Sequence, residues 1–176
     1  MLARIPEIDL RCETQVEGYL AARTGPVPQV RQLDSLTGEL DHAADLIRSW
    51  IASGECDPHA IGILVRDKAN RDRVASGLAS RGVEVRALDS GAIKPGAPVV
   101  LTMHRAKGTE FAKVLLFGVS ESSIPMGLKE YDCDAKDHAE AMLRERSLLY
   151  VAATRARDEL AVTYSGKPSE LMPGNG

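Results

Sequence analysis

The stretch Val99-Val100-Leu101-Thr102-Met103-His104-Arg105-Ala106-Lys107-Gly108-Thr109-Glu110-Phe111 joins a short apolar run directly to a polar loop that contains a glycine. The first four residues have the length and composition of a buried strand, because a strand covered on both faces is apolar throughout. The polar loop therefore begins where a buried strand ends. In α/β sheets this end of a strand is where ligands gather.

Other short apolar runs occur along the chain, and helical patterns separate them. Strands are expected at residues 61–65, 83–88, 99–102, 114–119 and 160–164. Amphipathic helices are expected from Ser35 to Gly54, from Asp67 to Gly82, and in a long stretch whose apolar stripe contains Met142, Leu143, Leu149, Tyr150 and Ala153. This alternation predicts an α/β domain with a largely parallel sheet flanked by helices.

We expect this domain to occupy residues 31–166. Residues 1–30 are interpreted as a boundary segment, because Gly25-Pro26-Val27-Pro28 interrupts any regular element. Residues 167–176 are interpreted as a tail that frays from about Pro168 onward.

Composition excludes several classes of protein. The 176 residues are 44% hydrophobic and 27% charged, as in ordinary globular domains. Three widely spaced cysteines predict no disulfide framework, and no apolar run has the length of a membrane span or a signal peptide, so a cytoplasmic protein is expected. The net charge of −3 argues against a globally basic nucleic-acid binder, so any nucleic-acid contact must come from a local cluster.

Several common ligand motifs are absent from the sequence. There is no GxxxxGK[ST] loop to cradle phosphates and no GxGxxG. The histidines and cysteines show no metal-ligand spacing, so we expect no metal site on this chain.

Two polar stretches carry the candidate chemistry. Residues 102–111 bring together a hydroxyl, an imidazole, two cations and a carboxylate, which suit a phosphodiester backbone and a ribose. The alternative for this stretch is a solvated loop with a glycine turn.

Residues 144–157 are helical and contain four arginines. A solvated face with helical salt bridges, Glu145 among them, explains Arg144 and Arg157 well. Arg155 leaves the helix away from the apolar stripe, so burial does not explain it.

The two stretches together resemble the fifth and sixth motifs of UvrD/Rep/PcrA-type superfamily 1 DNA helicases, in the same order and about forty residues apart. Ile61-Gly62-Ile63-Leu64-Val65-Arg66 resembles the fourth motif, a strand that ends in an arginine, and Ser123-Ile124-Pro125 resembles the short turn after the fifth. The resemblance covers about residues 58–165.

The resemblance implies that this chain is the second, C-terminal RecA-like domain of such a helicase, a P-loop NTPase-type domain that lacks the P-loop itself. ATP would bind in a cleft shared with an N-terminal RecA-like domain, which would supply the phosphate loop and the Mg²⁺ ligands. Matching positions imply γ-phosphate contacts from Arg66 and Arg155, ribose and phosphate contacts from Gly108 and Glu110, and single-stranded DNA contacts from Thr102, His104, Arg105 and Lys107. Lys113 is a further cation near the expected DNA track, and Arg146 is expected to be structural. A 3′-to-5′ polarity and an inactive isolated domain are also implied.

The sequence departs from the family pattern in several places. Val65 stands where the family has a tyrosine that stacks on adenine, Thr109 replaces a leucine and Arg144 replaces a glutamate. Only about ten residues separate Leu88 from Val99, where many members insert an accessory domain. The alternatives are therefore a helicase–nuclease subunit, a 5′-to-3′ translocase, and a non-catalytic DNA-binding or interaction module with a degenerate nucleotide cleft.

Overall fold

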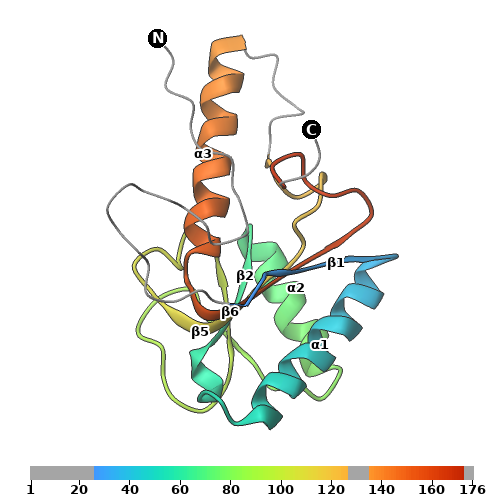
Figure 1. Ribbon diagram of the computed structural model, residues 1–176, viewed down its shortest axis with the longest axis vertical. Coiled ribbons are helices and arrows are strands. Elements are labelled where there is room, and N and C mark those ends of the chain that lie inside the picture. Colours follow the sequence, from blue (N-terminus) through green and yellow to red (C-terminus); the bar gives the residue numbers. More distant parts are fainter. Residues whose placement is uncertain (1–25, 127–134, 173–176) are drawn as a thin grey trace.

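The computed structural model describes residues 26–126 and 135–172 (Figure 1). The elements follow in the order β1 (Gln29–Leu33), α1 (Leu36–Ser53), a 3₁₀ turn (Pro58–Ala60), β2 (Ile61–Val65), α2 (Lys68–Ala79), β3 (Arg86–Ala87), β4 (Val99–Thr102), β5 (Phe111–Leu116), α3 (Ala135–Ala153) and β6 (Ala156–Ser165). The six strands form one sheet in the order β1-β6-β5-β2-β4-β3, and all of the pairings are parallel. The predicted α/β fold with a parallel sheet is confirmed.

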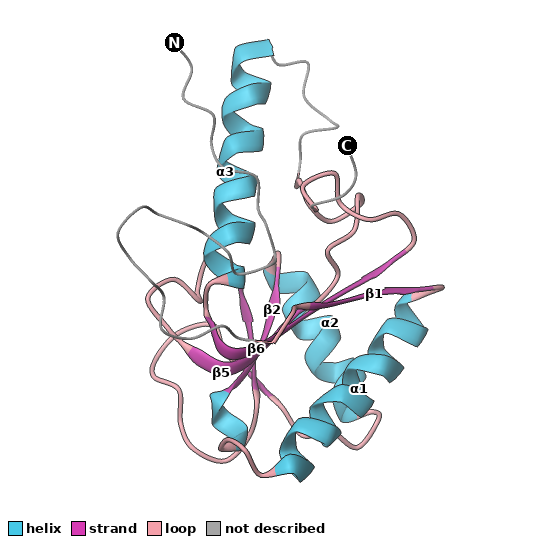
Figure 2. Cartoon of the chain, in the orientation of Figure 1, coloured by secondary structure: helices cyan, strands magenta, loops and turns pink. Residues whose placement is uncertain are grey.

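Both faces of the sheet are covered, as a parallel sheet requires. On β2, Ile61, Ile63 and Val65 belong to the core shared with α1 and α2, whereas Leu64 belongs to the core on the opposite face, under α3. The alternation follows from the two-residue period of a strand. Figure 2 shows α1 and α2 together beside the sheet, with α3 separate from them.

The local signals for the first two helices are correct. The hydroxyl of Ser35 accepts a hydrogen bond from the Gly38 amide at 3.1 Å, and the Asp67 carboxylate accepts one from the Asn70 amide at 2.8 Å. Both contacts are N-caps that satisfy otherwise unpaired amides of the first turn. Gly54 ends α1 with φ 67°, a left-handed conformation that favours glycine.

The outer strand β1 and the bounds of β3 and β6 differ from the prediction. β1 was not expected, because it lies at the edge with its side chains largely exposed and therefore lacks an apolar run. It pairs with β6 from Gln29↔Ala161 to Leu33↔Ser165. The strand expected at 83–88 contains only Arg86–Ala87, whereas β6 begins earlier than expected, at Ala156.

The prediction that the chain frays after Pro168 is wrong for the part that the structure describes. Ser169, Leu171 and Met172 are buried, and the Ser169 amide donates to the Val119 carbonyl at 3.1 Å. This segment closes the core under α3, so it belongs to the domain. The division of the chain at residues 30 and 166 otherwise stays a prediction, and residues 1–25 lie outside the described part.

The apolar stripe predicted for α3 is only partly correct. Leu149 and Ala152 are buried, whereas Leu143 and Tyr150 are exposed. The first turns of α3 extend past the sheet and so have no core to cover (Figure 1), whereas Tyr150 lies near the end of the helix, outside the face that contains the buried Leu149 and Ala152. Among the described residues, no helix combines the length and the apolar character that a membrane crossing requires.

Candidate functional site

Arg66 and the polar loop 103–110 lie at the same edge of the sheet, the one formed by the carboxyl ends of its strands. β2 and β4 are neighbours, with Val65 opposite Thr102, and the Met103 amide donates to the Val65 carbonyl at 2.8 Å. Arg66 and the polar loop 103–110 therefore leave adjacent strands at the same edge. This is the edge at which open parallel sheets bind ligands.

Arg66 forms a two-pronged ion pair with Glu145 of α3. Its Nε donates to Glu145 Oε2 at 2.9 Å and its Nη2 donates to Oε1 at 2.6 Å. The two side chains are only 13% and 11% exposed. The interpretation of Glu145 as part of a solvated helix face is therefore wrong. The sequence held a signal for its burial, since Glu145 precedes the buried Leu149 and Ala152 by four and seven residues, the spacing of one helix face.

The four residues predicted to contact DNA divide into two pairs. Thr102 is half-buried and its hydroxyl accepts from the Arg105 amide at 3.2 Å, while Arg105 Nη2 donates to the Gly91 carbonyl at 2.6 Å. Arg105 thus ties the polar loop to the short loop 89–98. His104 and Lys107 are exposed, and their side chains form no hydrogen bond or ion pair with the described residues.

The polar loop then crosses from the carboxyl ends of the strands to their amino ends, where β5 begins. Gly108 has φ 82°, which permits its turn, and Glu110 is exposed just before β5 begins. The Phe111 amide donates to the Arg155 carbonyl at 2.9 Å. The structure therefore brings Glu110 near Arg155, at the amino ends of β5 and β6.

Arg155 has structural contacts that the sequence did not predict. It is half-buried, and its Nε donates to the Val151 carbonyl at 3.1 Å while its Nη2 donates to the Thr154 hydroxyl at 3.2 Å. A cation on the last carbonyls of a helix is a common C-terminal cap. Burial and capping of the helix end therefore account for part of the placement of Arg155, beyond the expectation that burial does not explain it.

The two predicted γ-phosphate arginines are not brought together by the described structure. Arg66 lies past the carboxyl end of β2, whereas Arg155 lies before the amino end of β6. Between Glu145, which holds Arg66, and the end of α3 at Ala153 the helix rises about 12 Å. The candidate site is therefore extended, with the Arg66–Glu145 pair at one edge and Arg155 at the other.

The predicted solvated helix face is correct for Arg144, whereas Arg157 is exposed but lies in β6 and not on the helix. Exposed Arg144 pairs with Glu140 one turn earlier at 3.6 Å, and exposed Arg157 pairs with Asp158 at 2.8 Å. The Asp158 carboxylate also raises the pKa of Arg157 above its ordinary value through a hydrogen bond. Arg146 is half-buried, which is compatible with the structural part expected of it.

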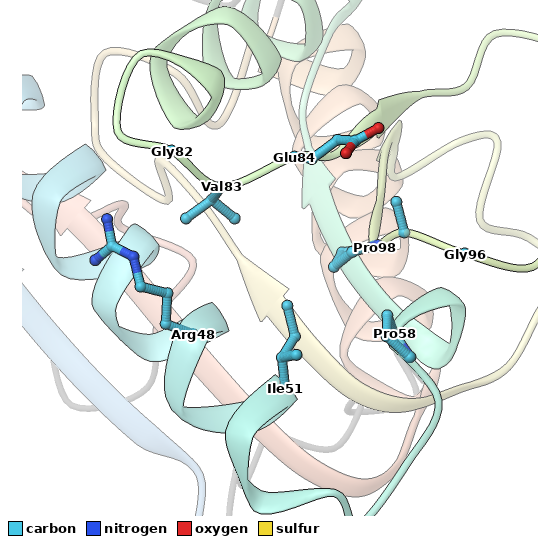
Figure 3. A pocket seen from close by; sticks show the side chains of 9 residues that line it. Arg48, Ile51, Pro58, Gly82, Val83, Glu84, Gly96 and Pro98 are labelled. Carbon is cyan, nitrogen blue, oxygen red and sulfur yellow. The ribbon is translucent and has the colours of Figure 1, made fainter.

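A cavity of about 210 Å³ lies away from these residues, beside the amino ends of β2 and β4 (Figure 3). Its wall combines apolar side chains such as Ile51 and Val83 with Arg48 and Glu84. None of the predicted site residues line it. In residues 26–126 and 135–172 no group of three or more His, Cys, Asp and Glu side chains is placed to hold a metal.

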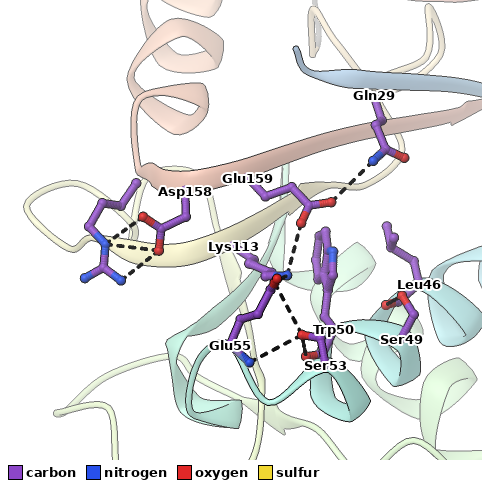
Figure 4. Close-up of polar contacts among 10 residues, drawn as sticks. Gln29, Leu46, Ser49, Trp50, Ser53, Glu55, Lys113, Asp158 and Glu159 are labelled. Carbon is purple, nitrogen blue, oxygen red and sulfur yellow. Dashed lines mark hydrogen bonds and ion pairs between the residues drawn. The ribbon is translucent and has the colours of Figure 1, made fainter. Parts of the chain in front are cut away.

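Lys113 does not lie on an exposed DNA track, so its interpretation as a DNA-binding cation is wrong. Its side chain is 5% exposed, and its Nζ donates to Glu55 at 2.5 Å and lies 3.1 Å from Glu159 (Figure 4). The Nζ also lies 5.8 Å from the centre of the Trp50 ring. Burial acts to lower the pKa of Lys113, but its hydrogen bonds to the two carboxylates raise that pKa above the ordinary value.

The fold and the site define an α/β domain with a fully parallel sheet of the RecA-like kind, with an arginine–carboxylate pair and a polar loop at its carboxyl edge. Residues 96–167 match the family of UvrD-like helicase C-terminal domains. This match agrees with the resemblance inferred from the motifs, and it covers the polar loop and α3.

Individual relatives agree with this match. The chain is 39% identical over 82 residues to the ATP-dependent DNA helicase PcrA of Staphylococcus aureus strain NCTC 8325, a match that covers 42% of this chain and 10% of the helicase. It is 43% identical over 61 residues to the putative ATP-dependent DNA helicase YjcD of Bacillus subtilis, covering 35% of this chain and 8% of that protein. The chain therefore matches about a tenth of the length of these relatives.

A solved structure shares the fold. The C-terminal domain of a possible DNA helicase from Lactobacillus plantarum WCFS1 superposes with a TM-score of 0.66 at 22% identity. The match covers 89% of this chain and 85% of that domain.

Proposed function

We propose that this chain is the C-terminal motor domain of an ATP-dependent DNA helicase or translocase that works in the cytoplasm. The observation that carries the proposal is Arg66, a guanidinium fixed at the carboxyl edge of the sheet with one side uncommitted. Its Nε and Nη2 are occupied by Glu145, while Nη1 has no partner among the described residues. The match of residues 96–167 to UvrD-like helicase C-terminal domains supports the reading of this edge as half of a nucleotide cleft.

The residues at this edge suit the phosphates of ATP, but they do not provide a site for its adenine base. A guanidinium is always charged and its planar donors fit phosphate oxygens. Val65 is fully buried in β2 and offers no ring for adenine. The N-terminal RecA-like domain would therefore supply the phosphate loop, the Mg²⁺ ligands and most of the nucleotide contacts. Bound Mg²⁺ would neutralise charge on the β- and γ-phosphates.

In the proposed mechanism, closure of the cleft brings Arg66 to the γ-phosphate. Arg155 reaches it only if the C-terminal end of α3 also faces the cleft, with Gly108 and Glu110 beside the ribose. Phosphoryl transfer is catalysed largely by positioning and by charge stabilisation, which is what an arginine provides. Single-stranded DNA would lie along the polar loop, at Thr102, His104, Arg105 and Lys107. Opening and closing of the cleft would move these contacts relative to the other domain, giving 3′-to-5′ translocation.

DNA-stimulated ATP hydrolysis by the full-length protein tests this proposal against a non-catalytic DNA-binding module. We expect hydrolysis that rises on addition of single-stranded DNA, and no hydrolysis by this domain alone, because it lacks the phosphate loop. An absence of hydrolysis in the full-length protein would favour the binding module.

Arg155→Lys in the same protein tests the second arginine. A lysine can still place a charge near the Val151 carbonyl but cannot form the same fork, so turnover should fall roughly 10³-fold if Arg155 contacts the γ-phosphate. The free energy of unfolding should fall by about 1 kcal/mol for the lost capping bonds. A loss of stability with turnover intact would make Arg155 a helix cap only.

A further inference from the structure

The strongest unexplained contact at the carboxyl edge is the carboxylate that holds Arg66. We propose that Glu145 is a positioning residue, which fixes the Arg66 guanidinium so that its free Nη1 side faces the γ-phosphate when the cleft closes. This inference rests on the proposed function, because it gives Glu145 a part in the phosphate contact assigned to Arg66.

The geometry of the pair fixes an orientation as well as a charge. Two parallel hydrogen bonds, of 2.9 and 2.6 Å, align the plane of the guanidinium with the plane of the carboxylate. A single hydrogen bond would leave the arginine free to rotate about it, whereas the fork prevents that rotation. An arginine that is already oriented loses less side-chain entropy when it meets a phosphate.

The pair also leaves the donors that a phosphate would need. Arg66 has five N–H groups, of which Glu145 occupies one on Nε and one on Nη2. The two N–H groups of Nη1 have no partner in the described part of the chain. A phosphate oxygen can therefore bind at Nη1 while the Glu145 fork stays in place, so the carboxylate and the phosphate need not compete. The lysine–glutamate ion pair of protein kinases shows that phosphate-binding cations are positioned in this way.

Glu145 is itself held in place. It lies on α3, is 11% exposed, and its Oε2 also accepts from the Met126 amide at 3.4 Å. Met126 ends the described loop that follows β5, so the carboxylate joins three segments, namely the end of β2, α3 and this loop. A carboxylate with one such backbone contact and a low exposure has little freedom to let Arg66 move.

The test is the variant Glu145→Gln in the full-length protein, with Glu140→Gln as the matched control. Glutamine keeps the size and one acceptor of Glu145 but removes the charge and one prong of the fork. We expect kcat for ATP hydrolysis to fall about ten- to a hundredfold, as for a misplaced catalytic group, with KM for ATP changed much less. Glu140 lies on the same helix and pairs with Arg144 at 3.6 Å in an exposed position, so its variant should leave kcat unchanged.

Binding of transition-state analogues separates positioning from a general structural effect. Glu145→Gln should weaken the binding of MgADP with aluminium fluoride by about the same factor as kcat, and leave the binding of MgADP unchanged, because only the former presents a γ-phosphate mimic. If Glu145→Gln lowers the melting temperature severely, Glu145→Asp keeps the charge and shortens the reach, and it should show the same selective loss. Equal weakening of both ligands, or no change in either, would overturn the proposal.

The variant Arg66→Ala separates a failure of the proposed function from a failure of the positioning role of Glu145. If Arg66→Ala retains full turnover, the γ-phosphate contact of the proposed function fails. If Arg66→Ala abolishes turnover while Glu145→Gln and Glu145→Asp match the wild type, the proposed function survives and the positioning part of Glu145 fails. If Glu145 positions Arg66, the double variant Arg66→Ala/Glu145→Gln should be no slower than Arg66→Ala alone.

Discussion

Two cations of low exposure lie toward opposite ends of the strands, and their donors are paired to different degrees. At the carboxyl edge, Arg66 has one carboxylate partner and an uncommitted Nη1. At the amino edge, Lys113 has two carboxylate partners, Glu55 and Glu159, and the face of Trp50 within 5.8 Å. An ammonium has three donors and no acceptor, so Lys113 has little left to offer a ligand, whereas Arg66 keeps three of its five donors.

The difference separates a structural brace from a prepared binding group. The Lys113 cluster, formed by Lys113, Glu55, Glu159 and Trp50, joins β5, β6, α1 and the segment after α1, and Gln29 extends it to β1 through a hydrogen bond of 3.3 Å to Glu159. These contacts explain why a lysine is tolerated inside a strand that is otherwise apolar. The Arg66–Glu145 pair joins fewer elements and lies at the edge where the polar loop begins.

The largest effect is expected for Arg66→Lys in the full-length protein. A lysine can keep an ion pair with Glu145 but has no second planar edge for a phosphate. Turnover of ATP should fall by roughly 10³-fold, as for other arginines in phosphoryl transfer. Steady-state ATPase measured beside thermal melting checks this, and retention of turnover within tenfold would remove the distinction drawn between the two cations.

Lys113→Met should lower the stability of the fold and leave ATP turnover unchanged, in contrast to Arg66→Lys. It removes the charge from a buried position and leaves Glu159, which is 20% exposed, without its cation. Because Glu55 is largely exposed and can be hydrated again, we expect the free energy of unfolding to fall by about 1–2 kcal/mol. ATP turnover of the full-length protein at a temperature well below melting should stay unchanged. A large loss of turnover in a folded Lys113→Met variant would show that the amino edge also takes part in the chemistry.

The sequence predicted those parts of the molecule that depend on local pattern. The buried strands, the caps at Ser35 and Asp67 and the glycine end of α1 follow from residue type and spacing, and the structure has all of them. The polar loop 102–111 and Arg66 could be located because each directly follows a buried strand. The strand β1 could not, since an exposed edge strand carries no apolar signal and is defined only by its pairing with β6.

The partners of the charged side chains could not be predicted in the same way. Glu145 and Arg66 are 79 residues apart, and Lys113 and Glu55 are 58 residues apart, so each pair exists only because the fold brings two elements together. A carboxylate on the buried face of a helix indicates that some cation must neutralise it, but not which one. For the same reason the sequence does not show that Lys113 is buried or that Arg155 contacts the Val151 carbonyl at the end of α3.

The smallest effect is expected for Glu55→Gln, which removes the exposed carboxylate of the Lys113 cluster. Its effect on the melting temperature should depend on pH. The hydrogen bond from Lys113 and its charge hold the pKa of Glu55 below the ordinary value of a glutamate. A carboxylate with a lowered pKa in the folded state stabilises the fold above its unfolded pKa of about 4.3, and this contribution is lost as the pH falls through the folded value. Glu55→Gln should therefore lower the melting temperature slightly at pH 7, and the difference from the wild type should shrink at about pH 3.

The magnitude stays small because the Glu55 side chain is 67% exposed, so water and salt screen its attraction to Lys113. Added salt at pH 7 should reduce the difference between the variant and the wild type in the same way. Glu84→Gln is the matched control, since Glu84 is exposed and forms no ion pair within the described residues, and its melting temperature should follow the wild type at both pH values. A Glu55→Gln difference that is the same at pH 7 and pH 3 would mean that the packing of this side chain, rather than its charge, contributes to the brace. The Lys113 cluster would then rest on Glu159 and Trp50 alone, and its contrast with the single carboxylate of Arg66 would be weaker.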